Sequence, residues 1–534
     1  MIKRIFSGQS KTITSAAVII GVASLASRVL GMLRDRILAG EFGAGRTLDI
    51  YYAAFRIPDL IYNLLVLGAL SAGFIPVFIS YYKNQEQDEW RLTSGVLNII
   101  VLSLLVLCGI LFFLSPWLVP LTVPGFDEAS KSLTVQLTQI MLLSPIFLGI
   151  SAIWGGILQS LKKFFVYSFA PIFYNIGIMV GALFFVRWWG VAGLAWGVVL
   201  GAFLHMIVQL PLVISSGFKY HWLFNWREAG IREILFLMIP RTLGLAISQV
   251  NLLVINIIGS TLLTGSIAIF NLANNLQSFP LGVFGISFAI AAFPTLSTFI
   301  ASGDKDNFVK SFSQTVRQIL FFIIPLSVMF LVLRAQIVRV ILGAGYFDWE
   351  DTILTADALA LFSISLFAQS LIPLLARGFY ALHNTLIPFV TGLVGAVVNI
   401  VLALSLAKVY GVAGLALAFS VSSIINMALL WIFLRFKVGR LDEANIIWSV
   451  AKISVATIAM ALVIQFLKYF VEPFTGTRTF LGILAQGGLA AFGGLIVFVL
   501  VSLLLKSEEM LLFITSLRRR FFRKEEVPKL EEEL

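Results

Sequence analysis

The sequence contains very few of the side chains that enzymes and disulfide-bonded proteins depend on. Among 534 residues there is one cysteine, and there are only three histidines. Cys108 lies in an apolar run, so the chain offers no internal disulfide and no thiolate metal site. His205, His221 and His383 are far apart in sequence, and no G-x-x-x-x-G-K-[ST], H-E-x-x-H or G-x-S-x-G motif is present. We therefore expect neither an enzyme nor a bound cofactor or metal.

Charged residues are also scarce, at 12% of the chain against 59% hydrophobic residues, and the mean hydropathy is +0.98. This composition excludes an ordinary water-soluble globule. Apolar runs long enough to cross ~30 Å of hydrocarbon as helices recur along almost the whole chain. We predict an all-α polytopic membrane protein with about fourteen transmembrane helices. The expected spans are 13–38, 48–80, 92–119, 130–160, 165–187, 190–215, 232–259, 264–299, 312–342, 353–382, 386–408, 411–436, 447–471 and 479–505.

The positions of lysine and arginine between these spans predict the orientation, because cytoplasmic loops carry an excess of basic residues. With the amino terminus inside, most basic residues fall on the cytoplasmic side. The opposite side carries Arg46, Lys131, Arg187, Lys408, Lys468 and Arg478. We therefore expect both termini and the 217–231 loop to be cytoplasmic. The net charge of +11 then results from the excess of basic residues in cytoplasmic loops and does not indicate a nucleic-acid partner. The basic segment "RRRFFRK" (518–524) is suited to contact with anionic lipid.

The chain contains an internal repeat. "WGVAGLAWGVV" at 189–199 returns as "YGVAGLALAFS" at 410–420, and "GFIPVFIS" at 73–80 has a counterpart in "AFPTLSTF" at 292–299. Two halves in parallel topology explain this pattern, and transporters of that kind bind substrate between the halves. We expect two pseudo-symmetric lobes around a central cavity. The expected divisions are 1–222 (helices 1–6), 223–440 (helices 7–12), 441–505 (helices 13 and 14) and a charged cytoplasmic tail at 506–534.

Polar side chains inside the first two spans follow helical spacing. On the first span Arg28 and Asp35 share a face, whereas Arg34 points elsewhere. On the second span one face carries a polar stripe, formed by Asp49, Tyr52, Arg56, Asp59 and Asn63. Buried arginines are costly and normally face a bundle interior or a wet cavity. Guanidinium groups suit bidentate binding of phosphate oxygens; alternatively, the aspartates only neutralise the arginines and lock the two helices together.

The seventh and eighth spans carry further polar residues. Arg241, Gly244, Ser248 and Asn251 form a stripe on the seventh. The eighth clusters Asn271, Asn274, Asn275 and Gln277 before Pro280. These amides are candidates for lining a cavity, with hydrogen bonding between helices as the alternative.

Several longer segments resemble the MurJ (MviN) lipid II flippases of the multidrug/oligosaccharidyl-lipid/polysaccharide exporter superfamily. The segment "ASRVLGMLRDRILAGEFGAGRTLDIYYAAFRIPDLIYNLLVLGALSAGFIPVF" (26–78) is similar to the amino-terminal signature of that family. Further matches are "VPGFD" (123–127), "FAPIFYNIGIM" (169–179), "FPLGVFGISFAIAAFPTLS" (279–297), "ARGFYALHNTLIPF" (376–389) and "YGVAGLALA" (410–418).

The resemblance implies fourteen helices in two lobes and alternating access around a cationic cavity. It implies export of an undecaprenyl-pyrophosphate-linked peptidoglycan precursor across the bacterial cytoplasmic membrane without ATP hydrolysis. The last two helices would bound a groove for the lipid tail. The implied partners are the lipid-linked muropeptide precursor and membrane lipids, with cell-wall synthesis enzymes as further candidates. Alternatives are export of another lipid-linked oligosaccharide, cation-coupled drug export, which should require acidic cavity residues, and a non-transporting scaffold.

The resemblance also assigns individual site residues. The cavity arginines of the family's first helix match Arg28 and Arg34, and its acidic residue at the start of the second helix matches Asp49, which we expect to orient Arg56. This chain departs from the family at Tyr62 and Asn275, where the family usually has arginine. We expect Arg241 to supply compensating positive charge. The candidate substrate-binding residues are therefore Arg28, Arg34, Asp49, Arg56, Arg241 and Asn275.

Overall fold

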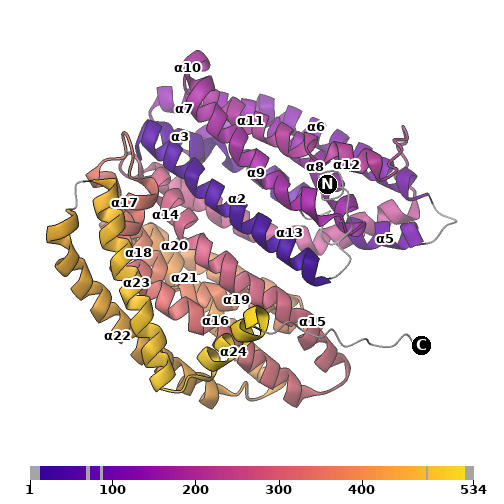
Figure 1. Cartoon of the computed structure of the whole chain (residues 1–534). Coiled ribbons are helices and arrows are strands. Elements are labelled where there is room, and N and C mark those ends of the chain that lie inside the picture. Colours follow the sequence, from indigo (N-terminus) through magenta and orange to yellow (C-terminus); the bar gives the residue numbers. More distant parts are fainter. Residues whose placement is uncertain (1–12, 68–72, 84–87, 477–478, 523–534) are drawn as a thin grey trace. The chain divides into compact units, whose positions relative to one another are not determined.

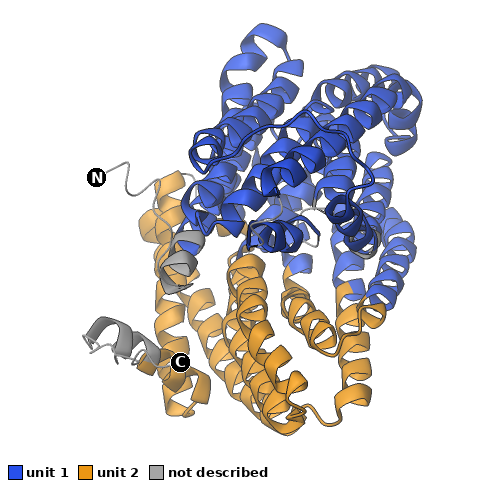
Figure 2. Ribbon diagram, turned by 90° about the vertical axis from the view of Figure 1, so that its right-hand side faces the viewer, with its two compact units in different colours: residues 1–279, 338–362, 389–422 blue, residues 280–337, 363–388, 423–534 orange. Residues whose placement is uncertain are grey.

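The computed structural model describes residues 13–67, 73–83, 88–476 and 479–522, and within these ranges the elements are helices joined by turns and by a longer loop at 216–228 (Figure 1). The all-α membrane architecture is thereby confirmed. The chain forms two compact units, each built from separate stretches of sequence (Figure 2).

The first unit comprises residues 1–279, 338–362 and 389–422. A large part of its core consists of buried aliphatic and aromatic residues that include Phe74, Leu92 and Ile157. Its helices are α2 (Ile13–Phe42), α3 (Arg46–Ala54), α4 (Arg56–Ile61), α5 (Ile75–Lys83), α6 (Glu89–Thr122), α7 (Glu128–Met141), α8 (Ser144–Ser160), α9 (Phe164–Val180), α10 (Val186–Trp189), α11 (Ala192–Ile207), α12 (Leu210–Ser215), α13 (Ala229–Ser260) and α14 (Ser266–Pro280, through Phe279), with π-helical segments η1 (Tyr62–Leu67) and η3 (Gly181–Phe185), and parts of α17 (Arg334–Leu342), α18 (Trp349–Ile364), α20 (Leu386–Tyr410) and α21 (Val412–Val438).

The second unit comprises residues 280–337, 363–388 and 423–534. Phe308, Phe312 and Phe379 are fully buried in its core. Its further elements are η4 (Leu281–Ile286), α15 (Ser287–Ala301), α16 (Lys305–Val332), α19 (Leu366–Ala381), α22 (Glu443–Thr475), α23 (Phe480–Leu504) and α24 (Glu508–Phe522).

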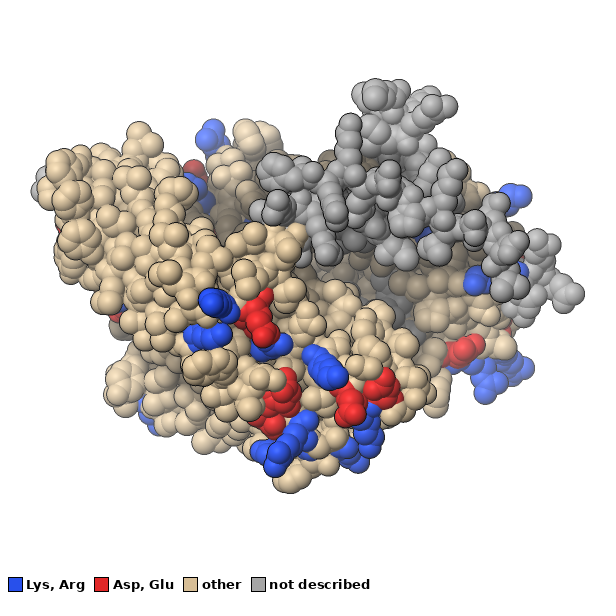
Figure 3. All heavy atoms as spheres, turned by 60° about the horizontal axis from the view of Figure 1, so that its bottom comes forward, with Lys and Arg blue, Asp and Glu red and all other residues tan. Residues whose placement is uncertain are grey.

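Ten helices in the described part of the chain are long and apolar enough to cross a membrane, and the number rises to twelve if each of two bent helix pairs is one span. The expected spans 13–38 and 48–80 are not among them. The total of fourteen therefore stays a prediction, as does the division into lobes at residues 222 and 440. The face in Figure 3 has acidic and basic side chains gathered in one region beside a flank with few charges, as expected for a membrane protein.

The expected span 48–80 is not one continuous helix. α3 ends at Ala54, α4 begins at Arg56, and the π-helical segment η1 follows from Tyr62 to Leu67. Phe55 keeps helical backbone angles between α3 and α4 (φ −69°, ψ −23°), whereas the π-helical segment departs from 3.6 residues per turn. The expected polar stripe from Asp49 to Asn63 stays a prediction, and within it Asn63 donates to the backbone carbonyl of Asp59.

The two copies of the repeated motif share their local structure. Gly190 and Gly411 both have positive φ, of 57° and 58°, immediately before α11 and α21. A Cβ on Gly193 would lie 2.4 Å from backbone at Phe185, and one on Gly414 would lie 2.3 Å from backbone at Leu406. In each copy the first glycine makes the turn and the second lets the new helix pack against the end of the preceding one.

The "GIMVG" motif at 177–181 packs α9 closely against α11, as its small residues predict. A Cβ on Gly177 would lie 2.3 Å from the Cα of Gly201, and one on Gly181 would lie 2.5 Å from the Cα of Gly197. Both approaches join backbone to backbone, so no side chain can move aside to make room.

Gly177→Ala is expected to destabilise the protein by about 1–3 kcal/mol, because the added methyl group overpacks this contact. Gly109→Ala is the matched control, since a Cβ there meets nothing within 4 Å. Removing a flexible glycine from the interior of α6 should make that variant equally stable or slightly more stable. Thermal unfolding of the detergent-purified proteins measures both changes, and equal unfolding temperatures would contradict the packing.

Candidate functional site

The candidate site lies within the first unit and is built on α2, α4, α9 and α14. The "SRVLGMLRDR" segment of α2 places Arg28, Arg34 and Arg36 on different sides of one helix. Arg34 meets side-chain oxygens, whereas Arg28 and Arg36 donate to backbone carbonyls.

Arg34 is paired with the residue next to it. Its Nη2 lies 2.7 Å from Oδ1 of Asp35, and its Nη1 donates to Oδ1 of Asn175 in α9 at 3.1 Å. Asn275 in α14 donates to the other carboxylate oxygen of Asp35 at 2.9 Å. Asp35 is only 4% exposed, so its charge is balanced inside the protein. The sequence placed Asp35 on the face of Arg28, and the structure instead pairs it with Arg34.

Arg28 has a neutral acceptor. Its Nη1 donates to the backbone carbonyl of Ser278 in α14 at 3.2 Å. Among the described residues no carboxylate forms an ion pair with Arg28. Its positive charge is therefore not cancelled, and several of its five N–H donors are available to another ligand.

Arg56 also has a neutral hydrogen-bond acceptor, and the carboxylate of Asp59, three residues further along α4, interacts with its charge. Its Nη2 donates to the amide oxygen of Asn271 in α14 at 2.8 Å, while its buried Nε has no hydrogen-bond partner. Asn271 is itself fixed by a hydrogen bond from its Nδ2 to the carbonyl of Ile267. A buried guanidinium with an unused donor is costly unless a ligand or water completes its contacts.

The sequence predicted that Asp49 orients Arg56, but the structure gives Asp49 other partners. Its two carboxylate oxygens accept the backbone N–H groups of Gly265 and Ala268 at 2.6 and 2.9 Å, at the start of α14. Asp49 is 2% exposed. A carboxylate at a helix N-terminus satisfies free N–H groups and interacts favourably with the helix dipole. Asp49 therefore positions α14, which carries the partners of Arg28, Asp35 and Arg56.

Two further predicted positions have different outcomes. Asn275 lies in the cluster as the partner of Asp35. Arg241 lies in α13, but its side chain is outside the described residues, so its predicted role stays a prediction. The departure from the family at Tyr62 falls at the first residue of η1.

Sequence reasoning did not single out Asn175 or Ser278. Asn175 stands alone in the apolar helix "FFVYSFAPIFYNIGIMV", and a lone buried amide in such a helix is the signal that identifies it. Ser278 contributes only its backbone carbonyl, which no sequence pattern reveals.

These features define a class of protein: an all-helical, multi-pass membrane transporter with guanidinium groups held among its buried helices. A family model described as "Lipid II flippase MurJ" matches residues 38–485. The chain belongs to the MurJ lipid II flippase family.

Individual relatives agree with this assignment. The chain is 32% identical to a probable lipid II flippase MurJ of Vibrio cholerae, over 84% of this chain and 88% of the relative. It is 31% identical to the one of Thermotoga maritima, over 91% and 95%. A solved MurJ structure in an inward closed conformation matches with a TM-score of 0.74 and 25% identity, covering 95% of this chain and 100% of the other.

More distant structures share the fold alone. An inward-facing multidrug resistance transporter of the MATE family, in the MOP superfamily, matches with a TM-score of 0.66 at 12% identity, covering 79% of this chain and 99% of that one. The family is one of transporters, so the prediction that the chain is not an enzyme is confirmed.

Proposed function

We propose that this chain translocates lipid II, the undecaprenyl-pyrophosphate-linked peptidoglycan precursor, from the inner to the outer leaflet of the bacterial cytoplasmic membrane by alternating access. One observation carries the proposal most directly: among the described residues, Arg28 and Arg56 donate hydrogen bonds to neutral oxygen atoms of α14. A diphosphate offers several anionic oxygens that can accept two parallel N–H bonds from each guanidinium. Binding would neutralise charges that are otherwise costly in a membrane.

The cluster suggests distinct roles for its members. Arg28 and Arg56 bind the diphosphate, while Arg34, neutralised by Asp35, contributes hydrogen bonds and orientation. Asn275 holds Asp35 in place. Asp49 acts through α14 as a positioning residue. The family usually has an arginine at the position of Asn275, and in this chain Arg241 supplies the positive charge in its place.

We assign the lipid tail to α22 and α23, within 441–505. These two helices pack closely, since a Cβ on Gly494 would lie 2.3 Å from a side-chain atom of Ile464, and one on Gly493 would lie 2.4 Å from Leu467. Their outer faces expose large apolar side chains, including Phe466 and Phe492. Such a surface suits a polyprenyl chain. The enzymes that make and consume lipid II are candidate partners.

The proposed function is tested by replacing the flippase of a cell. Cells depleted of their own flippase should grow and keep their shape when they express this chain, and lipid II should become accessible at the outer leaflet. The matched control is a variant in which Arg28 and Arg56 are both replaced by glutamine and which is expressed to the same level. The proposal would be contradicted if the cells grew with neither the native chain nor the glutamine variant, or if they grew equally well with both.

The proposed orientation places both termini and the 217–231 loop in the cytoplasm. A single cysteine introduced at His221 in a Cys108→Ser background should then resist a membrane-impermeant thiol reagent added to intact cells, and it should react after lysis. A cysteine in place of Lys131, expected outside, is the matched control. Labelling of His221→Cys in intact cells would show that the 217–231 loop lies outside and would contradict the proposed orientation.

A further inference from the structure

The last helix of the chain, α24, begins where a membrane-spanning helix ends. α23 ends at Leu504, and Lys506 has a φ of +49°. The N–H groups of Lys506 and Ser507 donate to the carbonyls of Leu503 and Ser502, which closes α23 with a left-handed turn. The chain then enters α24 at Glu508. Because only three residues separate the two helices, α24 starts at the membrane surface.

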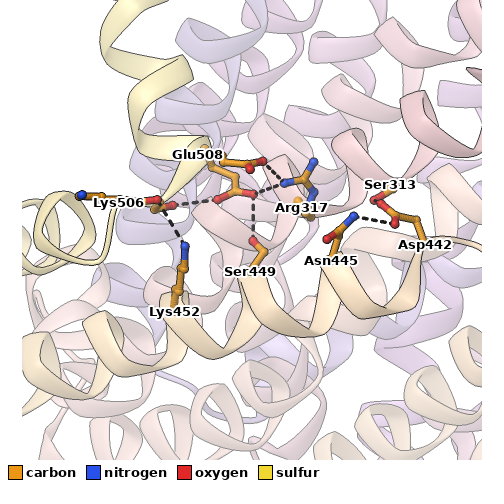
Figure 4. Close-up of polar contacts among 10 residues, drawn as sticks. Ser313, Arg317, Asp442, Asn445, Ser449, Lys452, Lys506 and Glu508 are labelled. Carbon is orange, nitrogen blue, oxygen red and sulfur yellow. Dashed lines mark hydrogen bonds and ion pairs between the residues drawn. The ribbon is translucent and has the colours of Figure 1, made fainter.

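The first turn of α24 is anchored to two other helices of the second unit (Figure 4). Arg317 of α16 lies 2.7 Å from Glu508 and 3.1 Å from Glu509. Ser449 of α22 and Ser507 donate to the two carboxylate oxygens of Glu509 at 2.9 and 2.8 Å. Glu509 is only 6% exposed, so this ion pair is sheltered from solvent and fixes the start of α24.

Beyond the anchor, α24 has an apolar side that is only partly covered. Met510 is buried in the core of the second unit, and the ring of Phe513 contacts that of Phe322 edge to face at 5.6 Å. Ile514 is 39% exposed. By helical spacing Met510, Ile514, Leu517 and Phe521 follow i, i+4, i+7 and i+11 and form one stripe. By sequence spacing the stripe therefore continues beyond Ile514.

Basic residues accompany this stripe. Arg518, Arg519 and Arg520 fall in the last turns of α24 and are followed in sequence by Arg523 and Lys524. At 100° per residue, Arg518 and Arg520 fall on opposite flanks of the apolar stripe and Arg519 falls opposite it. This is the pattern of helices that lie in the plane of a membrane surface.

Side chains near the first turn of α24 are of the types found at the boundary between the apolar membrane and the lipid headgroups. Lys452 lies over the ring of Trp448 at 5.6 Å and donates to the carbonyl of Lys506. Trp448 is 65% exposed. Tryptophan and lysine are enriched where the apolar membrane meets the headgroups.

We propose that α24 lies in the membrane surface, that Ile514, Leu517 and Phe521 enter the acyl region, and that Arg518, Arg519 and Arg520 bind anionic phospholipid headgroups. The anchor at Arg317 connects this lipid contact to α16 and α22. This inference does not depend on the identity of the transported molecule. It commits to phospholipid because the stripe is apolar, the flanks are cationic and the helix follows a membrane span directly.

The test uses the full chain with Cys108→Ser, reconstituted into vesicles with bromine-labelled acyl chains. A fluorescent label on Leu517→Cys should be quenched when the vesicles contain equal phosphatidylcholine and phosphatidylglycerol. A label on Thr515→Cys, away from the stripe, is the matched control and should be quenched much less. With phosphatidylcholine alone, quenching at position 517 should fall.

A charge variant separates headgroup binding from simple insertion. R518Q/R519Q/R520Q should lower the ratio of bound to unbound helix roughly 100-fold, because each arginine near an anionic surface contributes on the order of a factor of five. K219Q/R227Q/R232Q removes three exposed basic residues elsewhere and should leave quenching unchanged. Equal quenching at positions 515 and 517, the same quenching in both lipid mixtures, or no effect of the α24 triple change would each overturn the proposal.

Discussion

Replacing Arg28 with alanine is expected to reduce lipid II translocation by about tenfold to a hundredfold, while the protein still folds. The reason is that, among the described residues, Arg28 hydrogen-bonds the neutral carbonyl of Ser278, and in the proposed function its charge binds the diphosphate. Hydrogen bonds to charged groups are each worth about 1.5–3 kcal/mol, and about 1.4 kcal/mol corresponds to a factor of ten. Arg28→Lys should lie between alanine and the native protein, because lysine keeps the charge and loses the planar fork.

The measurement is the amount of lipid II accessible at the outer leaflet at equal protein level. Arg36→Ala is the matched control on the same helix, because Arg36 donates to the carbonyls of Val340 and Ile341 and so supports structure. That variant should lower the unfolding temperature without a selective loss of diphosphate binding. A fully active, correctly folded Arg28→Ala protein would remove Arg28 from the proposed site.

Replacing Asp49 with alanine is expected to destabilise the protein by about 2–4 kcal/mol. The change leaves the N–H groups of Gly265 and Ala268 without their acceptor, and each buried, unsatisfied donor costs about 1–3 kcal/mol. Transport should fall as well, since α14 carries the groups that hold Arg28 and Arg56. Asp49→Asn should be milder, because its amide oxygen can still accept one of the two bonds.

Thermal unfolding of the purified protein measures the effect of Asp49. Gly265→Ala disturbs the start of α14 by a separate route, since a Cβ there would overlap the carbonyl of Ala44 and the residue has a φ of +92°. Both variants should lower the unfolding temperature. A native unfolding temperature for Asp49→Ala would show that Asp49 does not fix α14.

The sequence was sufficient for the helical membrane architecture and the family, because long apolar runs and extended motifs are local properties of the chain. It also identified Arg28, Arg34 and Arg56 as unusual, since each is an arginine in an apolar helix. The close packing at "GIMVG" and the shared geometry of Gly190 and Gly411 likewise follow from local sequence.

The contacts of these residues could not be predicted in the same way. Arg28 and Ser278 are 250 positions apart, and Arg56 and Asn271 are 215 apart. Helical spacing assigned Asp49 to the face of Arg56, but Asp49 accepts backbone N–H groups of Gly265 and Ala268, which are 216 and 219 positions away. Helical spacing describes neighbours on one helix, so it does not reveal a partner from a distant segment.

The most direct test of the account measures translocation of fluorescently labelled lipid II by the purified chain in proteoliposomes. The native protein should move the label across the bilayer faster than protein-free vesicles do, and a variant with Arg28 and Arg56 both replaced by glutamine should move it at the protein-free rate when equal amounts of folded protein are inserted. Equal rates for the native protein and this variant, or no movement with either, would contradict the claim that buried guanidinium groups carry the diphosphate across the membrane.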